Sequence, residues 1–93
     1  MPFEIGTLLM TKGIGAEMNR NADFAKFVVD SFYDRYRQND WGDICHEDKQ
    51  MNDSAVKNND DRIFARYNNE HGNIYIITEW DRSATTILFT HEY

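Results

Sequence analysis

The C-terminal third of the chain contains three short apolar segments separated by turn-forming residues. The segments span 62–67, 73–80 and 85–90 and are rich in β-branched and aromatic residues, which favour strands. The first two are joined by the five residues 68–72, which end in Gly72, and the last two by 81–84, where Asp81 can hydrogen-bond the following backbone. The pattern predicts a three-stranded antiparallel meander.

An earlier strand is expected over 3–11. Phe3, Ile5 and Leu9 fall on one side of an extended chain, while Leu8 and Met10 fall on the other. The stretch 12–15 contains two glycines, which favour a turn. We therefore expect the strand to end there in a turn.

Two helices are expected between this strand and the meander. The first spans 22–37, with Asn21 as its cap, because large apolar side chains recur at every fourth residue: Phe24, Val28, Phe32 and Tyr36. The second spans 43–57, with Asp43 as its cap and a thin apolar stripe of Ile44, Met51 and Ala55. The chain is therefore predicted to be a single α+β domain over 1–93. Its four-stranded sheet, antiparallel or mixed, would have two helices inserted after the first strand.

The middle strand of the meander is apolar on both faces. Ile74 and Ile76 alternate with Tyr75 and Ile77 along it. We expect one face to pack against the helices and the other against a further helix or another subunit.

Composition limits where such a chain can work. No apolar run approaches the roughly 18 residues that span a bilayer, and the first residues lack the features of a secretory signal. The single cysteine, Cys45, cannot form an internal disulfide. Together these features predict a cytoplasmic protein without a membrane partner.

No catalytic or metal centre is predicted. Cys45, His46, His71 and His91 could supply zinc ligands, but their spacing matches no known metal motif. No third group is placed to orient a Cys-His pair, and no carboxylate lies in a clearly apolar setting. We therefore expect no enzyme activity, no metal and no cofactor.

Negative charge is concentrated between positions 40 and 61. The stretch contains seven acidic residues and only two lysines, so it carries −5 of the net charge of −6. Such a surface opposes direct contact with nucleic acid and attracts a basic groove on another protein. The alternative is an ordinary solvated helix face. The candidate partner-binding acids are Asp43, Glu47, Asp48, Asp53, Asp60 and Asp61.

Two further residues are candidates for partner binding. Trp41, between the two predicted helices, could anchor a partner or instead plug one end of the core. Arg82 lies in the polar turn 81–86 and could bind a partner, or could hold the fold together by pairing with Asp43 or Glu79. Catalysis by this turn is a third alternative.

Several segments together resemble a family of short proteins carried by bacterial plasmids, phages and integrated elements. They are 11–13, 40–43, the trio Glu47, Asp48 and Asn52, and, most specifically, 76–79, 81–83, 85–89 and 92–93. Members are often labelled plasmid-related proteins, and sometimes subunit M of type I restriction methyltransferases. Methyltransferase activity is not expected here, because Gly13-Ile14-Gly15 lacks the third glycine of a cofactor loop and the only proline is Pro2.

The resemblance and the acidic stretch together suggest a function. We expect a non-enzymatic accessory protein of a mobile element that binds a host protein through its acidic surface. Inhibition of a defence nuclease, by an anti-CRISPR or anti-restriction mechanism, is the most concrete form. The alternative is a structural or regulatory subunit that associates with itself, for example as a homodimer.

Overall fold

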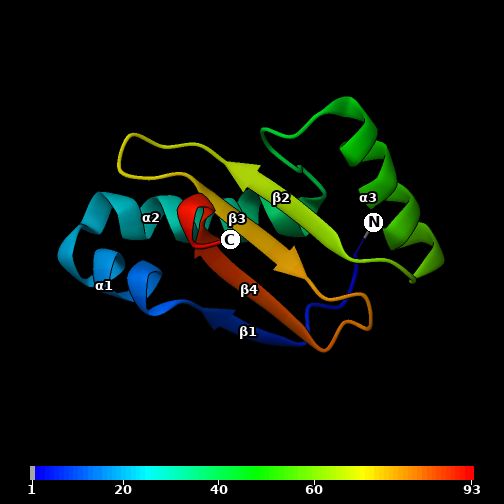
Figure 1. Ribbon diagram of the computed structural model, residues 1–93, viewed down its shortest axis with the longest axis horizontal. Helices are drawn as coiled ribbons and strands as arrows, with labels where there is room; N and C mark the ends of the chain where they lie inside the picture. Colours follow the sequence, from blue (N-terminus) through cyan, green and yellow to red (C-terminus); the bar gives the residue numbers. More distant parts are fainter. Residues whose placement is uncertain (1) are drawn as a thin grey trace.

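The computed structural model describes residues 2–93, and its centre is a mixed sheet with helices against one face (Figure 1). The strands are β1 (Thr7–Met10), β2 (Ile63–Tyr67), β3 (Ile74–Thr78) and β4 (Ala84–Phe89), in the order β1-β4-β3-β2. Strands β2, β3 and β4 form the antiparallel meander, and β1 lies parallel to β4. The predicted α+β class with a four-stranded mixed sheet is confirmed.

The helical segments lie between β1 and β2, apart from a short one at the C-terminus. They are α1 (Lys12–Arg20), α2 (Ala22–Asp30), the π-helical turn η1 (Ser31–Arg35), the 3₁₀ turn η2 (Tyr36–Gln38), α3 (His46–Asn58) and the 3₁₀ turn η3 (Thr90–Glu92). Helix α2 runs behind the sheet, whereas α3 lies beyond the β2 edge (Figure 1). No helix formed by residues 2–93 is both long and apolar enough to cross a membrane.

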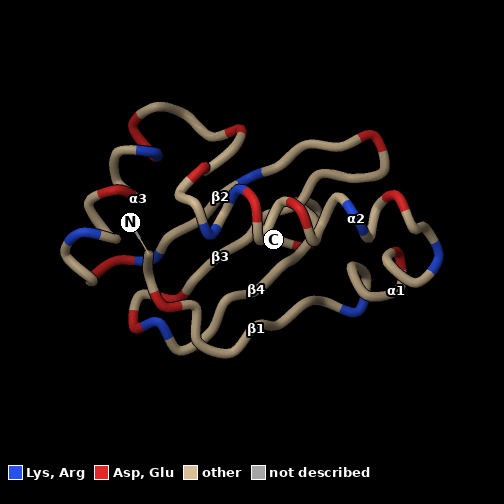
Figure 2. Tube along the Cα trace, turned by 180° about the vertical axis from the view of Figure 1, so that it is seen from behind, with Lys and Arg blue, Asp and Glu red and all other residues tan. Residues whose placement is uncertain are grey.

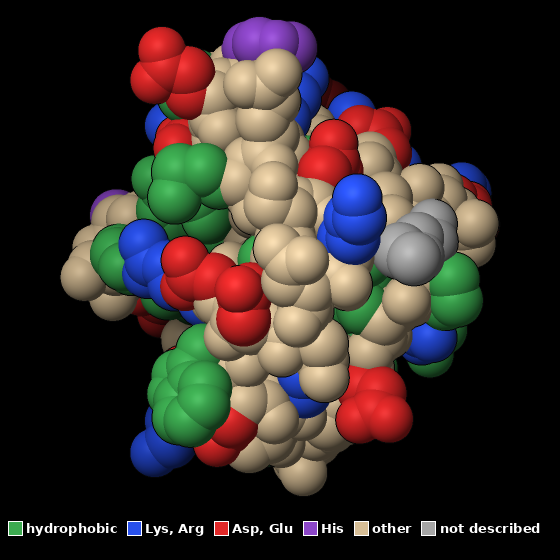
Figure 3. Space-filling view, turned by 90° about the vertical axis from the view of Figure 1, so that its right-hand side faces the viewer, with side chains coloured by type: hydrophobic (Ala, Val, Ile, Leu, Met, Phe, Trp, Pro, Cys, Tyr) green, Lys and Arg blue, Asp and Glu red, His purple; other side chains and the backbone are tan. Residues whose placement is uncertain are grey.

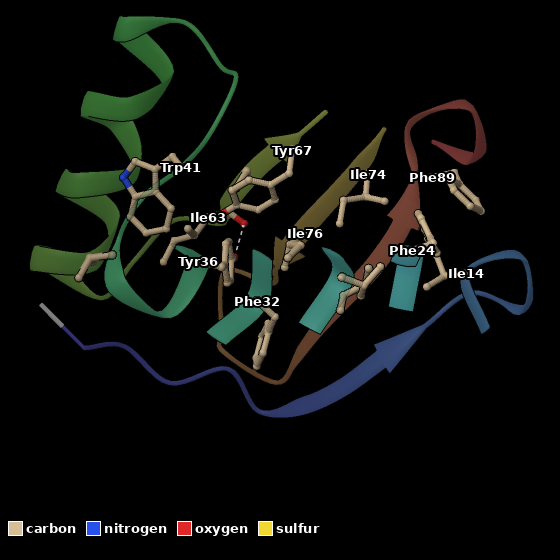
Figure 4. Close-up of a cluster of buried hydrophobic side chains, with 14 of the residues drawn as sticks. Ile14, Phe24, Phe32, Tyr36, Trp41, Ile63, Tyr67, Ile74, Ile76 and Phe89 are labelled. Carbon is tan, nitrogen blue, oxygen red and sulfur yellow. Dashed lines mark hydrogen bonds between the residues drawn. The ribbon is translucent and has the colours of Figure 1, made fainter. Parts of the chain in front are cut away.

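The predicted helix over 22–37 corresponds to α2 and the two turns that follow it. Its cap is Asn21, whose side-chain oxygen accepts hydrogen bonds from the backbone N–H groups of Asp23 and Phe24 at 3.0 and 3.2 Å. The four apolar side chains spaced by four residues are all buried. Figure 4 shows Phe24, Phe32 and Tyr36 packed against the sheet.

The predicted turn over 12–15 is wrong, because these residues begin α1. The Thr11 hydroxyl caps this helix by accepting from the N–H of Ile14 at 3.2 Å, and Ile14 is fully buried. A side chain at Gly13 would come within 2.8 Å of the Glu92 carboxylate, so this glycine makes room for the C-terminus. The predicted strand over 3–11 is also too long, since Gly6, with φ of +61°, interrupts it before β1.

The predicted cap at Asp43 is wrong as well. Helix α3 begins at His46 after Cys45, which makes no side-chain capping bond. The Asp43 carboxylate instead accepts from the backbone N–H of Asn68, at 3.3 Å. Asp43 therefore ties the segment before α3 to the end of β2.

A chain of buried hydroxyl groups links the helical layer to the sheet. The Thr85 hydroxyl donates to the Ile5 carbonyl at 2.7 Å, so its oxygen can only accept from Thr78, which lies 2.7 Å away. The Thr78 oxygen then accepts from the Tyr36 hydroxyl, again at 2.7 Å. Each group has a partner, so the polar atoms carry little penalty for burial.

The β2 edge of the sheet is closed by the chain itself. The Asn52 side chain of α3 hydrogen-bonds the β2 backbone in the way that a neighbouring strand would. Its amide nitrogen donates to the Phe64 carbonyl at 2.6 Å, and its oxygen accepts from the Phe64 N–H at 3.2 Å. The next backbone groups on the outer side of β2 are those of Arg66. Its N–H donates to the Trp41 carbonyl, and its carbonyl accepts from the Asp43 N–H. Asn52 is only 1% exposed, so this contact is part of the core.

Replacing Asn52 tests whether this closure stabilises the fold. We expect Asn52→Ala to lower the free energy of unfolding by roughly 2–4 kcal/mol, because two buried backbone groups lose their partners. The exposed Asn58→Ala on the same helix is the control and should change stability by less than about 0.5 kcal/mol. Urea unfolding of both variants provides the comparison, and equal stability would contradict the role given to Asn52.

Candidate functional site

A shallow groove with acidic margins runs along the exposed side of α3. Its lining residues are Glu47, Gln50, Met51, Ser54, Ala55, Asn58, Asp60 and Asp61. Glu47, Met51 and Asn58 share this side because their spacing of four and seven residues brings them together on a helix. We call this surface the acidic groove. Figure 3 faces this end of the molecule and shows acidic side chains between hydrophobic ones.

A second hollow continues the acidic groove toward the β3–β4 turn. It is lined by Asn59, Asp60, Trp80, Asp81 and Arg82, and it shares Asp60 with the groove. Trp80 is 65% exposed and Met51 is 60% exposed, which is unusual for such large apolar side chains. The combined surface therefore presents two apolar groups among carboxylates.

The carboxylates of this surface are available to an outside partner. Among residues 2–93, the ion pairs involve none of Glu47, Asp60, Asp61 and Asp81. Hydrogen bonds from the Ser83 hydroxyl and backbone hold the pKa of the Asp81 carboxyl below its usual range, so this group stays charged. The acids of 40–61 lie mostly around α3 and its flanking loops (Figure 2).

Arg82 fastens the parts of this surface to one another. Its guanidinium group donates to the carbonyls of Ala55 at 2.9 Å, Asp61 at 2.6 Å and Trp80 at 3.1 Å, and also to that of Glu79. It forms no ion pair with Asp43 or Glu79, so the carboxylate partners expected from the sequence are wrong. With only 6% of its surface exposed, Arg82 offers little to a binding partner.

Trp41 is buried, and the exposed Asp53 is hydrogen-bonded to it. Trp41 is 3% exposed, packs against Phe3 and Tyr36, and donates from its indole nitrogen to the Asp53 carboxylate at 2.9 Å. Asp53 therefore lies on a different side of α3 from the acidic groove. Their hydrogen bond joins α3 to the part of the core that contains Phe3 and Tyr36.

The structure thus divides the acids proposed from the sequence into two sets. Glu47, Asp60 and Asp61 meet in the acidic groove. Asp43 and Asp53 make structural hydrogen bonds elsewhere, and Asp48 is half-buried in the first turn of α3. Only the first set forms a continuous accessible surface.

Sequence reasoning missed Met51 and Trp80 as surface groups. Met51 was assigned to the apolar stripe of its helix, and Trp80 to the end of a strand. A usable signal was the position of Trp80 directly before Asp81, a residue that favours turns.

The open face of the sheet carries a third, smaller hollow of about 160 Å³, lined by Arg62, Phe64, Tyr75, Ile77 and Tyr93. The Arg62 guanidinium lies 5.5 Å from the centre of the Phe64 ring and donates to the Tyr93 hydroxyl at 2.9 Å. Its volume is comparable to that of a cavity that holds a benzene-sized molecule. Among residues 2–93, no α-helix covers this face, and the C-terminal segment lies over part of it through the contact between the Tyr93 and Tyr75 rings (Figure 1). Packing of this face against another subunit stays a prediction.

The possible zinc ligands do not meet. In the described part of the chain, no three histidine, cysteine, aspartate or glutamate side chains are grouped so as to hold a metal ion. Cys45 precedes α3, the His71 ring contacts Asn21, and the His91 ring stacks on Phe89.

Two substitutions of Arg82 distinguish the contribution of its side chain to stability from that of its backbone conformation. Its φ of +63° is strained for any residue except glycine. We expect Arg82→Ala to destabilise the fold by about 3 kcal/mol or more, since several buried carbonyls lose a charged donor. Arg82→Gly should recover about 1 kcal/mol of that loss by relieving the backbone. Thermal and urea unfolding measure both effects, and an Arg82→Ala variant as stable as the wild type would refute this assignment.

Comparison with known proteins supplies no family for this chain: no family model, curated protein or solved structure matches it.

Proposed function

We propose that this protein is a non-enzymatic binding module that docks a basic surface of another protein onto its acidic groove and Trp80. The observation that carries the proposal is the set of carboxylates, none in an ion pair among residues 2–93, around two exposed apolar side chains, Met51 and Trp80. Apolar anchors provide affinity when a partner excludes water from them, while the surrounding charges provide specificity and speed of association.

The charge of the groove favours one kind of partner. Glu47, Asp60 and Asp61 repel phosphate groups but attract lysine and arginine side chains. A protein channel that normally holds nucleic acid is lined with such side chains. A basic nucleic-acid channel is therefore the partner surface that best complements the groove.

Defence nucleases have channels of this kind. The resemblance of the sequence to proteins of plasmids and phages motivates this choice, since a mobile element benefits from blocking such an enzyme. In its most concrete form, the proposal is inhibition of a CRISPR effector or a restriction enzyme in the cytoplasm. The protein would compete with DNA for the channel and would need no chemistry of its own.

Charge reversal in the groove tests the proposal. Glu47→Lys with Asp60→Lys should abolish inhibition of DNA cleavage by a purified CRISPR effector or type I restriction enzyme that the wild type inhibits, because like charges then meet in the channel. Raising the salt concentration should weaken wild-type inhibition, since exposed charges are screened.

A matched control changes the same amount of charge elsewhere. Asp34→Lys with Glu70→Lys replaces two exposed acids outside the groove and should leave inhibition unchanged. Circular dichroism verifies that both variants are folded. Equal inhibition by the groove variant and the wild type would overturn the mechanism, and so would failure of the wild type to inhibit any enzyme of either class.

The apolar part of the surface is tested separately. Trp80→Ala should weaken binding to the inhibited nuclease at least tenfold, because an exposed Trp at the centre of an interface is worth about 2 kcal/mol or more. Tyr33→Ala is the control, since Tyr33 is also exposed, at 55%, but lies outside the groove. Calorimetric titration measures both affinities, and equal effects of the two changes would argue against Trp80 as an anchor.

A further inference from the structure

The fold covers one edge of the sheet and leaves the other uncovered. Asn52 and the segment 41–43 occupy the hydrogen-bonding groups of β2, as described above. Strand β1 forms the other edge and pairs only with β4 among the described residues. Its outer side is not covered by any helix or loop (Figures 1 and 2). An uncovered edge strand is a template for pairing with another strand.

The side chains of β1 lack the features that usually protect an edge. Leu8, Leu9 and Met10 are 39%, 48% and 45% exposed, and the strand contains no lysine, proline or other interrupting residue. Three consecutive exposed apolar residues are costly on a free surface. This edge is therefore suited to burial against a partner.

The free backbone groups of β1 are arranged symmetrically. The N–H groups of Thr7 and Thr11 donate to Ser83 and Ile87 of the β4 segment, at 3.0 and 3.1 Å. The backbone N–H and C=O groups of successive residues in a strand point to opposite sides. Those of Leu9 therefore also point toward β4, whereas those of Leu8 and Met10 point outward from the sheet edge. Two copies of β1 can then pair antiparallel, with Leu8 of each opposite Met10 of the other and Leu9 opposite itself.

The flanking charges favour this direction of pairing. Glu4 precedes β1 and Lys12 follows it, and both are exposed. In an antiparallel pair, the acidic end of one strand lies beside the basic end of the other, whereas a parallel pair would bring like charges together. The same strand thus complements itself in both charge and hydrogen bonding.

We propose that the protein forms a twofold symmetric homodimer through β1, which joins the two sheets into one continuous eight-stranded sheet. Leu8 and Met10 of the two copies meet on the face that carries the helices, and the two Leu9 side chains meet on the open face. This interface is separate from the acidic groove and does not depend on the function proposed for it.

Charged substitutions at Leu9 provide the test, because in the proposed dimer Leu9 lies opposite Leu9 of the second copy. Analytical ultracentrifugation of the wild type should give about twice the mass of the 11.0 kDa chain. Leu9→Lys alone and Leu9→Glu alone should each reduce the mass about twofold by placing like charges together. Mixing the two variants should restore the dimer, since Lys then faces Glu.

Met51→Lys is the control, because it adds the same charge at an exposed apolar residue of the acidic groove. It should leave the dimer intact while weakening partner binding, which separates the two proposals. A wild type that is monomeric at all concentrations would overturn the proposed dimer, and so would a dimer unaffected by either Leu9 variant. Failure of the mixture to restore the dimer would exclude the symmetric pairing at Leu9.

Discussion

The hydrogen bonds of Arg82 are the interaction on which the functional surface depends. One guanidinium group in the turn after β3 donates to the carbonyls of Trp80 in that turn, of Ala55 near the end of α3 and of Asp61 in the loop before β2. Arg82 lies 27 residues from Ala55 and 21 from Asp61 in the sequence. These segments carry the groups of the acidic groove and Trp80. A positive charge buried beneath the acids also offsets part of their mutual repulsion. Arg82 thus adds a direct link between the segments that carry the carboxylates and the turn that carries Trp80.

Much of the fold could be predicted from the sequence because its signals are local. The meander follows from alternating residues and turn chemistry, and α2 follows from its apolar spacing and the Asn21 cap. Helix α1 could not be found in this way. Gly13 signals a turn by itself, yet the structure uses it to accommodate Glu92, a residue far along the chain. Asp43 was misassigned for a similar reason, since its partner, Asn68, lies across the fold.

The candidate site was predictable in its charge but not in its geometry. The sequence places seven acids between 40 and 61. Only the structure shows that Asp53 is held by Trp41, whereas Asp60 is accessible beside Trp80. Hydrogen bonds to residues elsewhere in the fold decide which carboxylates are already occupied within the molecule. The proposed surface is consequently smaller than the acidic stretch and contains apolar groups that charge counting overlooks.

The π-helical turn η1 explains how the apolar spacing of the long helical segment works. A strict repeat of four residues drifts by about 40° at each step around an ideal α-helix, or by roughly 120° from Phe24 to Tyr36. The wider turn, in which the Tyr36 N–H reaches back to the Ser31 carbonyl, takes up part of that rotation. Tyr36 therefore still points at the sheet, where its hydroxyl meets Thr78. A repeat of four in an apolar stripe can thus encode a local change in helical pitch as well as a buried face.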